Sequence, residues 1–141
     1  MTEKSPATHS LPKGCKAVIQ GLKSANVRIL AMIMDTNIAP LITEIFADPF
    51  FHSVRCCSEE EAIAIATGAT LTGRRGATIF QNAGLFSSGR GIVLAQTVSA
   101  PVLMLVSHRG GEQEPAIPYH IYKGEKTKPL LDALRVHQAN I

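Results

Sequence analysis

The chain has 141 residues, which is enough for one domain and hardly for two. Apolar residues make up 45% and charged residues 18%, so a buried core is expected and a mainly disordered chain is excluded. Fourteen Lys and Arg against eleven Asp and Glu give a net charge of +3, and aromatic residues are only 5%. These values argue against a nucleic-acid partner but are compatible with a small anionic ligand.

The ends of the chain and its cysteines predict a cytoplasmic protein. Residues 1–12 are rich in Ser, Thr and Pro, so we expect a disordered leader followed by one domain over residues 13–141. No secretory signal is evident, and the longest apolar runs, Val27–Met34 and Ala100–Val106, are too short to span a membrane. Three cysteines, two of them adjacent, cannot form an even set of disulfides, which favours reduced thiols.

The first half of the chain predicts two helices and two strands. Apolar residues recur every three or four positions in Lys13–Ser24, as in an amphipathic helix. Val27–Met34 is almost continuously apolar, as is typical of a parallel strand buried on both faces. A helix over residues 38–46 then stops at Asp48-Pro49, and a short strand follows at Phe51–Cys56.

The second half continues the alternation. Ser58 is the expected N-cap of a helix over Glu59–Leu71, with Glu61 completing a capping box. Beyond it we expect a strand at Ala77–Phe80, a helix over residues 85–98, a strand at Pro101–Val106, a polar loop at Ser107–Pro118, and a helix at Thr127–His137 with Leu130, Leu131 and Leu134 facing inward.

Strands and helices that alternate with short connections indicate right-handed βαβ crossovers. The predicted fold is therefore α/β, a doubly wound parallel sheet with helices on both faces. In such sheets, ligands bind where the carboxyl ends of the strands meet.

Polar side chains follow all four predicted strands. They are Asp35, Thr36 and Asn37 after the first, Ser58 and Glu59 after the second, Gln81, Asn82 and Gly84 after the third, and Ser107, His108, Arg109 and Gly110 after the fourth. Structural roles are the alternative for each of them: turns and caps, a helix N-terminus for the glutamates, a loop tether for the amides, and a surface cation for the arginine.

Other motifs are incomplete. Gly84–Gly91 has the glycine spacing of a phosphate-binding loop but lacks the Lys-Ser/Thr that grips phosphate and Mg²⁺. His52, Cys56 and Cys57 do not have zinc-ligand spacing, and Ser87-Ser88 lacks the Gly-x-Ser-x-Gly elbow.

An ordered set of segments resembles the pyrimidine-binding domain of thiamine-diphosphate enzymes. The segments are Ser58–Gly68, Gly73, Ile79–Leu85, Asp35-Thr36, Ser107–Gly110, Lys123–Thr127 and Leu130–Leu134. Within that family the sequence is most similar to the sulfopyruvate and phosphonopyruvate decarboxylase group, over roughly Gly14 to Val136. It departs from the group at Met34, where Pro is usual, and at Phe86-Ser87, where Gly-Asn is usual.

The resemblance implies roles for individual residues. Glu59 would be catalytic, its carboxyl bonded to N1′ of the cofactor's aminopyrimidine in a partly apolar setting. The residues implied to bind thiamine diphosphate are Glu59, Gln81, Asn82, Gly84 and Leu85, and those implied to contact substrate are Asp35, Thr36, Asn82, His108 and Arg109. No metal ligand is expected in this chain.

The resemblance also implies a partner, because the sequence contains no Gly-Asp-Gly motif for a metal-bound diphosphate. A separate β subunit with the diphosphate-binding domain would hold the diphosphate and Mg²⁺, giving a hetero-oligomer that decarboxylates a small anionic 2-oxo acid, sulfopyruvate being favoured. Two alternatives stay open: another thiamine-diphosphate decarboxylase or carboligase, for phosphonopyruvate or a different 2-oxo acid, and a non-catalytic module that binds a phosphorylated metabolite.

Overall fold

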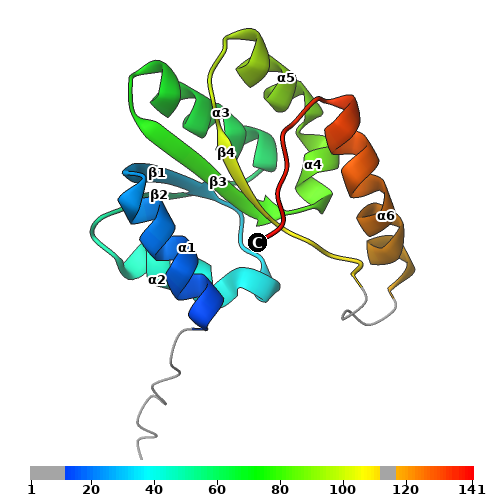
Figure 1. Cartoon of the computed structure of the whole chain (residues 1–141), viewed down its shortest axis with the longest axis horizontal. Coiled ribbons are helices and arrows are strands. Elements are labelled where there is room, and N and C mark those ends of the chain that lie inside the picture. The colour runs from blue at the N-terminus through cyan, green and yellow to red at the C-terminus, as the bar shows by residue number, and fades with distance from the viewer. Residues whose placement is uncertain (1–11, 112–116) are drawn as a thin grey trace, which may run out of the picture.

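A computed structural model describes residues 12–111 and 117–141, so the predicted leader lies outside the described residues except for Pro12 (Figure 1). The strands of this part are Val27–Met32 (β1), His52–Arg55 (β2), Arg75–Gln81 (β3) and Leu103–Ser107 (β4). Its α-helices are Lys13–Ser24 (α1), Ala39–Ala47 (α2), Glu59–Leu71 (α3), Ala83–Ser87 (α4), Gly89–Thr97 (α5) and Pro118–Ala133 (α6). None of these helices is long and apolar enough to cross a membrane.

The four strands form one parallel sheet in the order β2-β1-β3-β4. Leu30 of β1 is level with Ser53 of β2 on one side and with Ala77 of β3 on the other. The chain therefore winds outward from β1 in both directions, and the strand order reverses between β1 and β3. The predicted doubly wound α/β fold is confirmed.

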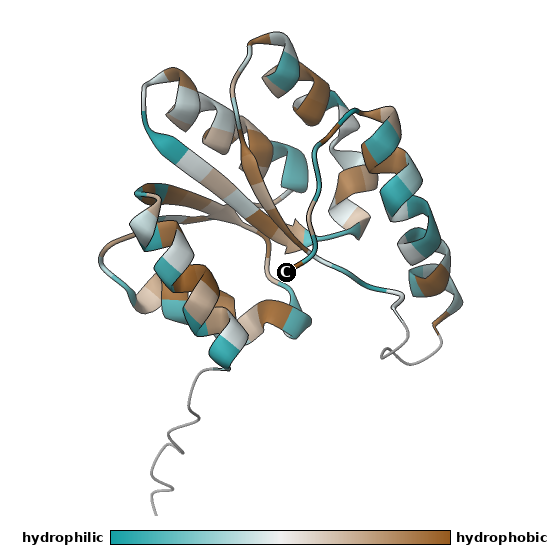
Figure 2. Ribbon diagram, in the orientation of Figure 1, coloured by the Kyte–Doolittle hydropathy of each residue, from teal (hydrophilic) through white to brown (hydrophobic). Residues whose placement is uncertain are grey.

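Helices cover both faces of the sheet because successive side chains of each strand point to opposite faces. Ile79 packs with Ile42 and Ile45 of α2 on one face, whereas the next residue, Phe80, packs with Ile63 of α3 and Ile92 of α5 on the other. Figure 2 shows the apolar colouring gathered on the strands. Each fully buried side chain of this size contributes about 1.5–3 kcal/mol to folding.

The predicted helix over residues 85–98 is wrong, because two helices, α4 and α5, meet at Ser88. Ser88 directs both its N–H and its hydroxyl at the carbonyl oxygen of Gly84, which closes α4 after one turn. The chain then restarts at Gly89, and Gly91 of α5 lies next to Glu60 and Ile63 of α3. The boundaries of all four strands also differ. The predicted strands Val27–Met34, Phe51–Cys56, Ala77–Phe80 and Pro101–Val106 are observed as Val27–Met32, His52–Arg55, Arg75–Gln81 and Leu103–Ser107.

The last helix is Pro118–Ala133, so it begins and ends earlier than the predicted Thr127–His137. Proline suits a first helical turn, where its missing N–H has no intrahelical acceptor. Pro129 lies inside α6, and the helix continues through it. Leu130, Leu131 and Leu134 pack against the cluster around Phe80, as predicted. The predicted polar loop, Ser107–Pro118, overlaps residues 112–116, which are outside the described residues.

Candidate active site

The polar residues that follow the four strands lie along one edge of the sheet, since the strands are parallel. Asp35 follows β1, Glu59 follows β2 as the first residue of α3, Asn82 follows β3, and Arg109 follows β4. Contacts between them form two groups, one around Asp35 and one around Glu59.

Asp35 is the centre of the first group, and its side chain is only 1% exposed. Arg109 Nη2 donates to Asp35 Oδ1 over 2.9 Å and to Thr36 Oγ1 over 2.8 Å. The Ser107 hydroxyl donates to the other carboxylate oxygen, Oδ2. Both carboxylate oxygens of Asp35 therefore accept hydrogen bonds from side chains at the end of β4, more than seventy residues further along the chain.

Burial alone would raise the pKa of Asp35, because the charged form loses hydration. The hydrogen bonds from Ser107, Arg109 and the N–H of Asn37, together with the charge of the guanidinium, act in the opposite direction. The net result is a pKa below the usual value for an aspartate. Asp35 is therefore ionised at neutral pH and holds Arg109 in place.

Asn82 is fully buried and uses both ends of its amide. Its Nδ2 donates to the carbonyl oxygen of Arg109 and to Thr127 Oγ1, each over 3.0 Å. Its Oδ1 accepts from the N–H of Arg109 over 3.3 Å. One side chain thus joins the end of β3 to the turn after β4 and to α6.

Glu59 forms the second group with α4. Its side chain lies directly across Gly84: a Cβ at position 84 would be 2.2 Å from Glu59 Cγ and 2.8 Å from Oε1. The Ser87 hydroxyl lies 3.5 Å from Glu59 Oε2 and donates to the Gly84 carbonyl over 3.0 Å. Leu85 is buried beneath this contact. The half-buried carboxyl is thereby placed against the segment that was predicted to bind the cofactor.

The two neighbouring glutamates have structural partners. Glu60 forms an ion pair with Arg90 of α5 at 2.7 Å. The N–H of Glu61 donates to the Ser58 hydroxyl, which confirms the predicted N-cap, but the Glu61 carboxylate accepts from the N–H of Cys57 rather than from that of Ser58. The predicted capping box is therefore only half formed, because the Glu61 carboxylate bonds to the N–H of the residue before the N-cap.

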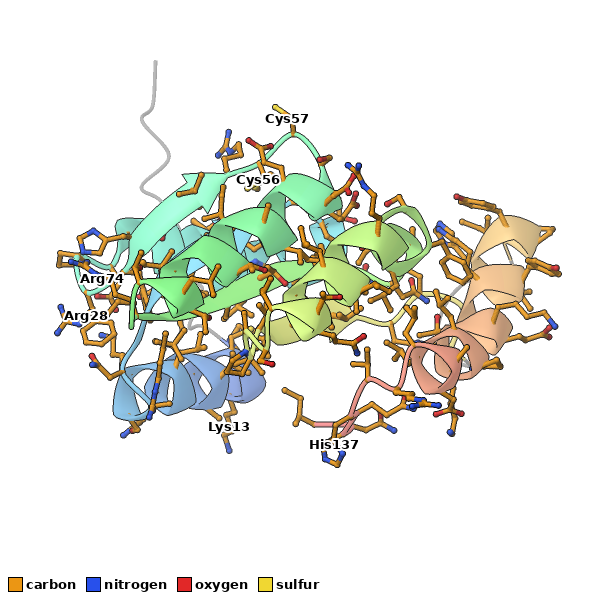
Figure 3. All side chains as sticks on the ribbon, turned by 90° about the horizontal axis from the view of Figure 1, so that it is seen from above. Lys13, Arg28, Cys56, Cys57, Arg74 and His137 are labelled. Carbon is orange, nitrogen blue, oxygen red and sulfur yellow. The ribbon has the colours of Figure 1, made fainter. Side chains whose placement is uncertain are left out.

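The three cysteines are all unpaired thiols. Cys56 is buried, and its burial together with the negative charge of Glu61 raises its pKa. Cys57 is exposed, and its sulfur points outward from the turn before α3 (Figure 3). In residues 12–111 and 117–141, no three His, Cys, Asp or Glu side chains are placed to bind a metal ion together.

Not every predicted site residue joins these two groups. Gln81 is half-buried at the end of β3, and His108 is exposed, with no hydrogen bond to Asp35 or Arg109 among the described residues. Gly84–Gly91 is helical rather than an open phosphate-binding loop. Conversely, the Ser107 hydroxyl contacts Asp35 and the Ser87 hydroxyl contacts Glu59, although the sequence predicts no role for either serine. Serines are common at the ends of strands and helices, so their sequence positions alone do not indicate a site.

The α/β fold and the order of its elements agree with a known class of enzyme domains. The family described as thiamine pyrophosphate enzyme, N-terminal TPP binding domain, matches residues 12–136. The chain belongs to this family, and the resemblance found in the sequence is confirmed.

Individual relatives are similar over most of the chain. The sulfopyruvate decarboxylase subunit alpha of Methanocaldococcus jannaschii is 32% identical over 88% of this chain and 73% of its own length. That of Methanothermobacter thermautotrophicus is 35% identical over 86% and 73%. The phosphonopyruvate decarboxylase of Streptomyces viridochromogenes is 31% identical over 84% of this chain but only 30% of its own length.

Proposed function

We propose that this chain is the α subunit of a thiamine-diphosphate-dependent decarboxylase that acts with a β subunit and converts sulfopyruvate to sulfoacetaldehyde and CO₂. The observation that carries the proposal is the placement of Glu59 across Gly84 at the carboxyl edge of the sheet. The names of the relatives support the choice of reaction, and the alpha-subunit names among them support the need for a partner.

The residues present fit the aminopyrimidine ring of the cofactor. Gly84 has no side chain, so the carboxyl of Glu59 lies over the backbone of α4 and stays accessible to a ring at this edge. Glu59 would bond the ring nitrogen, with Gln81, Asn82, Gly84 and Leu85 around it. When bound, thiamine diphosphate supplies the nucleophilic carbon and the electron sink that decarboxylation of a 2-oxo acid requires. The β subunit would hold the diphosphate and Mg²⁺.

Substrate binding is assigned to the group around Asp35. A 2-oxo acid with a second acidic group carries two negative charges, which require donors in the site. Arg109 and Thr36 are the donors next to Asp35, and His108 is adjacent in sequence. Because Asp35 already accepts from Ser107 and Arg109, its part is to orient these donors, while Asn82 holds the backbone of Arg109.

An apolar groove along α3, the helix that Glu59 begins, supports association with the β subunit. The groove has a volume of about 680 Å³ and runs between α3 and α5. Two leucines that line it are largely exposed, Leu71 at 61% and Leu94 at 57%. Since α3 begins with Glu59, a subunit that covers this groove also lies next to the carboxyl edge of the sheet. We assign the groove to the β subunit on this continuity.

The test is to assay CO₂ release by the chain alone and with the β subunit, using sulfopyruvate, phosphonopyruvate and pyruvate. We expect release from sulfopyruvate only when both subunits are present. Faster release from phosphonopyruvate would favour the second candidate, which the 31%-identical Streptomyces relative supports. Full activity of the chain alone would contradict the requirement for a partner.

The role of Glu59 is tested in the same complex. Glu59→Gln should lower turnover by about a thousandfold or more, because the amide cannot share a proton with the ring nitrogen, while the melting temperature stays unchanged. Glu60→Gln is the matched control: it removes a carboxylate from the same helical turn and should retain turnover. Near-normal rates for Glu59→Gln would remove this residue from the mechanism.

A further inference from the structure

Thr127 is a buried polar residue of α6 to which the proposed function gives no role. It is 8% exposed, and its hydroxyl takes part in two hydrogen bonds. Oγ1 donates to the carbonyl oxygen of Lys123, one turn earlier in the helix, over 2.8 Å. A hydroxyl has a single proton, so Oγ1 acts towards Asn82 as an acceptor, and Asn82 Nδ2 donates to it over 3.0 Å. The bond within α6 therefore sets the direction of the bond to Asn82.

The Asn82 amide has one orientation in which all these neighbours are matched. Its Nδ2 carries two N–H groups and has two acceptors, Thr127 Oγ1 and the Arg109 carbonyl oxygen, while Oδ1 accepts from the Arg109 N–H. In the reverse orientation, Oδ1 would face the carbonyl oxygen of Arg109 and Nδ2 would face its N–H, so both contacts would be repulsive. The backbone of Arg109 and the hydroxyl of Thr127 therefore select the same orientation of the amide.

The hydroxyl is needed because Asn82 is fully buried. Without it, one N–H of Nδ2 would have no acceptor at this position, and a buried donor that loses its acceptor is costly. The amide would turn or shift to recover a bond, and any such movement changes its two contacts with Arg109. The orientation of Asn82 thus depends on a residue of α6.

Asn82 in turn holds the backbone of a residue assigned to substrate binding. It bonds both polar backbone groups of Arg109, the N–H over 3.3 Å and the carbonyl oxygen over 3.0 Å. From this backbone the Arg109 side chain extends to Asp35 and Thr36, with Nη2 at 2.9 and 2.8 Å from their oxygens. Thr127 is therefore connected to the guanidinium through one intermediate side chain.

We propose that Thr127 is a positioning residue for substrate binding: its hydroxyl holds the Asn82 amide, and this amide holds the backbone from which Arg109 presents its guanidinium. The effect on substrate rests on the function proposed above, whereas the positioning of Asn82 and Arg109 does not. A donor such as Arg109 binds the charged substrate in the ground state as well as in the transition state. Loss of the Thr127 hydroxyl should therefore weaken substrate binding and leave the chemical step nearly unchanged.

The positioning is tested on the full chain alone, by NMR measurement of how fast the side-chain N–H groups of Asn82 exchange with water. In the wild type we expect both N–H groups to be protected. Thr127→Val has nearly the same shape but no hydroxyl, and should speed exchange of the Asn82 side chain and of the Arg109 backbone N–H at least about tenfold. Thr127→Ser keeps the hydroxyl and should stay within about threefold of wild type.

Thr67→Val is the matched control. Thr67 is also 8% exposed, and its hydroxyl donates to the carbonyl oxygen of Ile63, four residues earlier, over 2.7 Å, but it belongs to α3. This variant should leave exchange at Asn82 and Arg109 unchanged. Equal effects of the two valine variants would overturn the proposal. Rapid exchange of the Asn82 side chain in the wild type would overturn it as well, and that measurement does not depend on the folding of any variant.

The effect on substrate is tested in the complex with the β subunit. Thr127→Val should raise KM for sulfopyruvate at least about fivefold with kcat within about twofold, and Thr127→Ser should have the KM of wild type. Arg109→Lys, which keeps a cation next to Asp35, should raise KM by itself. Adding Thr127→Val to Arg109→Lys should then raise KM no further, because both changes act through the same guanidinium.

Three results in the complex would overturn the role in substrate binding: an unchanged KM in Thr127→Val, a fall in kcat at constant KM, or effects of Thr127→Val and Arg109→Lys that multiply. The last result is what a general loss of stability would give. If the wild-type complex does not decarboxylate sulfopyruvate, the proposed function fails, whereas the exchange rates still decide whether Thr127 holds Asn82 and Arg109.

Discussion

The missing side chain at position 84 determines where the carboxyl of Glu59 lies. Glu59 and Gly84 come from different helices, and the space that a Cβ of residue 84 would fill is taken by Cγ, Cδ and Oε1 of Glu59. The atoms in conflict belong to the flexible end of a glutamate rather than to backbone. A larger residue at 84 would therefore displace Glu59 without breaking the fold.

We accordingly predict that Gly84→Ala lowers turnover of the complex at least about tenfold while the melting temperature stays within a few degrees of wild type. Gly89→Ala is the matched control, because no atom lies within 4 Å of a Cβ at that position. Enzyme assays and thermal melts of both variants check this. Normal turnover in Gly84→Ala would show that the position of Glu59 tolerates displacement.

The sequence identified the residues of the site better than the contacts between them. Asp35, Thr36 and Arg109 were selected because each follows a predicted strand, and the structure brings all three together. Their pairing depends on β1, β3 and β4 being neighbours, and no local pattern contains that order.

At the scale of elements, local signals explain which predictions succeeded. Helix α3 was predicted with both its bounds, since Ser58 caps one end and Gly73, at a positive φ of 76°, follows the other. Helix α6 contains Pro129 and begins with weakly apolar residues, so its extent is set by packing rather than by local sequence. The division between α4 and α5 likewise depends on a side chain, Ser88, that folds back on the preceding turn.

The packing of α6 on the turn after β4 requires Gly110. This residue has a positive φ of 85°, and a Cβ there would be 2.0 Å from the backbone oxygen of His120. Gly110→Ala should lower the free energy of unfolding by roughly 2–4 kcal/mol, because neither the backbone strain nor the clash has a flexible side chain to relieve it.

Urea unfolding of the full chain measures this effect. Gly111→Ala is the control, since the nearest atom to a Cβ there is His108 Cδ2 at an ordinary 3.7 Å, and we expect a change within about 0.5 kcal/mol. Equal stabilities of the two variants would mean that α6 does not depend on this close contact.

For the molecule as a whole, the sheet order brings the ends of β1 and β4 close enough for one buried ion pair to connect them. Asp35 follows β1, Arg109 follows β4, and β3 lies between these strands. The pKa of Asp35 is below its usual value in the folded state, so the ionised carboxylate stabilises the fold at neutral pH. This contribution is present above about pH 4, the unfolded value, and is lost as the pH falls through the folded pKa.

Asp35→Asn should therefore destabilise the chain by roughly 2–4 kcal/mol at pH 7, since Arg109 loses its buried counter-ion. The difference between wild type and variant should narrow in acid, as the pH falls through the folded pKa of Asp35. Urea denaturation at pH 7 and at a series of acidic pH values checks this. Asp132→Asn, which removes an exposed partner of Lys128, should change little at any of these pH values. A constant gap between wild type and Asp35→Asn would contradict the linkage.

The hydrogen bonds of the Asn82 side chain also affect which parts of the molecule can unfold locally. One enclosed amide links the end of β3, the turn after β4 and helix α6. Helix α6 cannot detach without breaking these bonds, so the backbone amides of all three segments should open in a single cooperative event. Protection of these three segments against amide hydrogen exchange should therefore be gained and lost together.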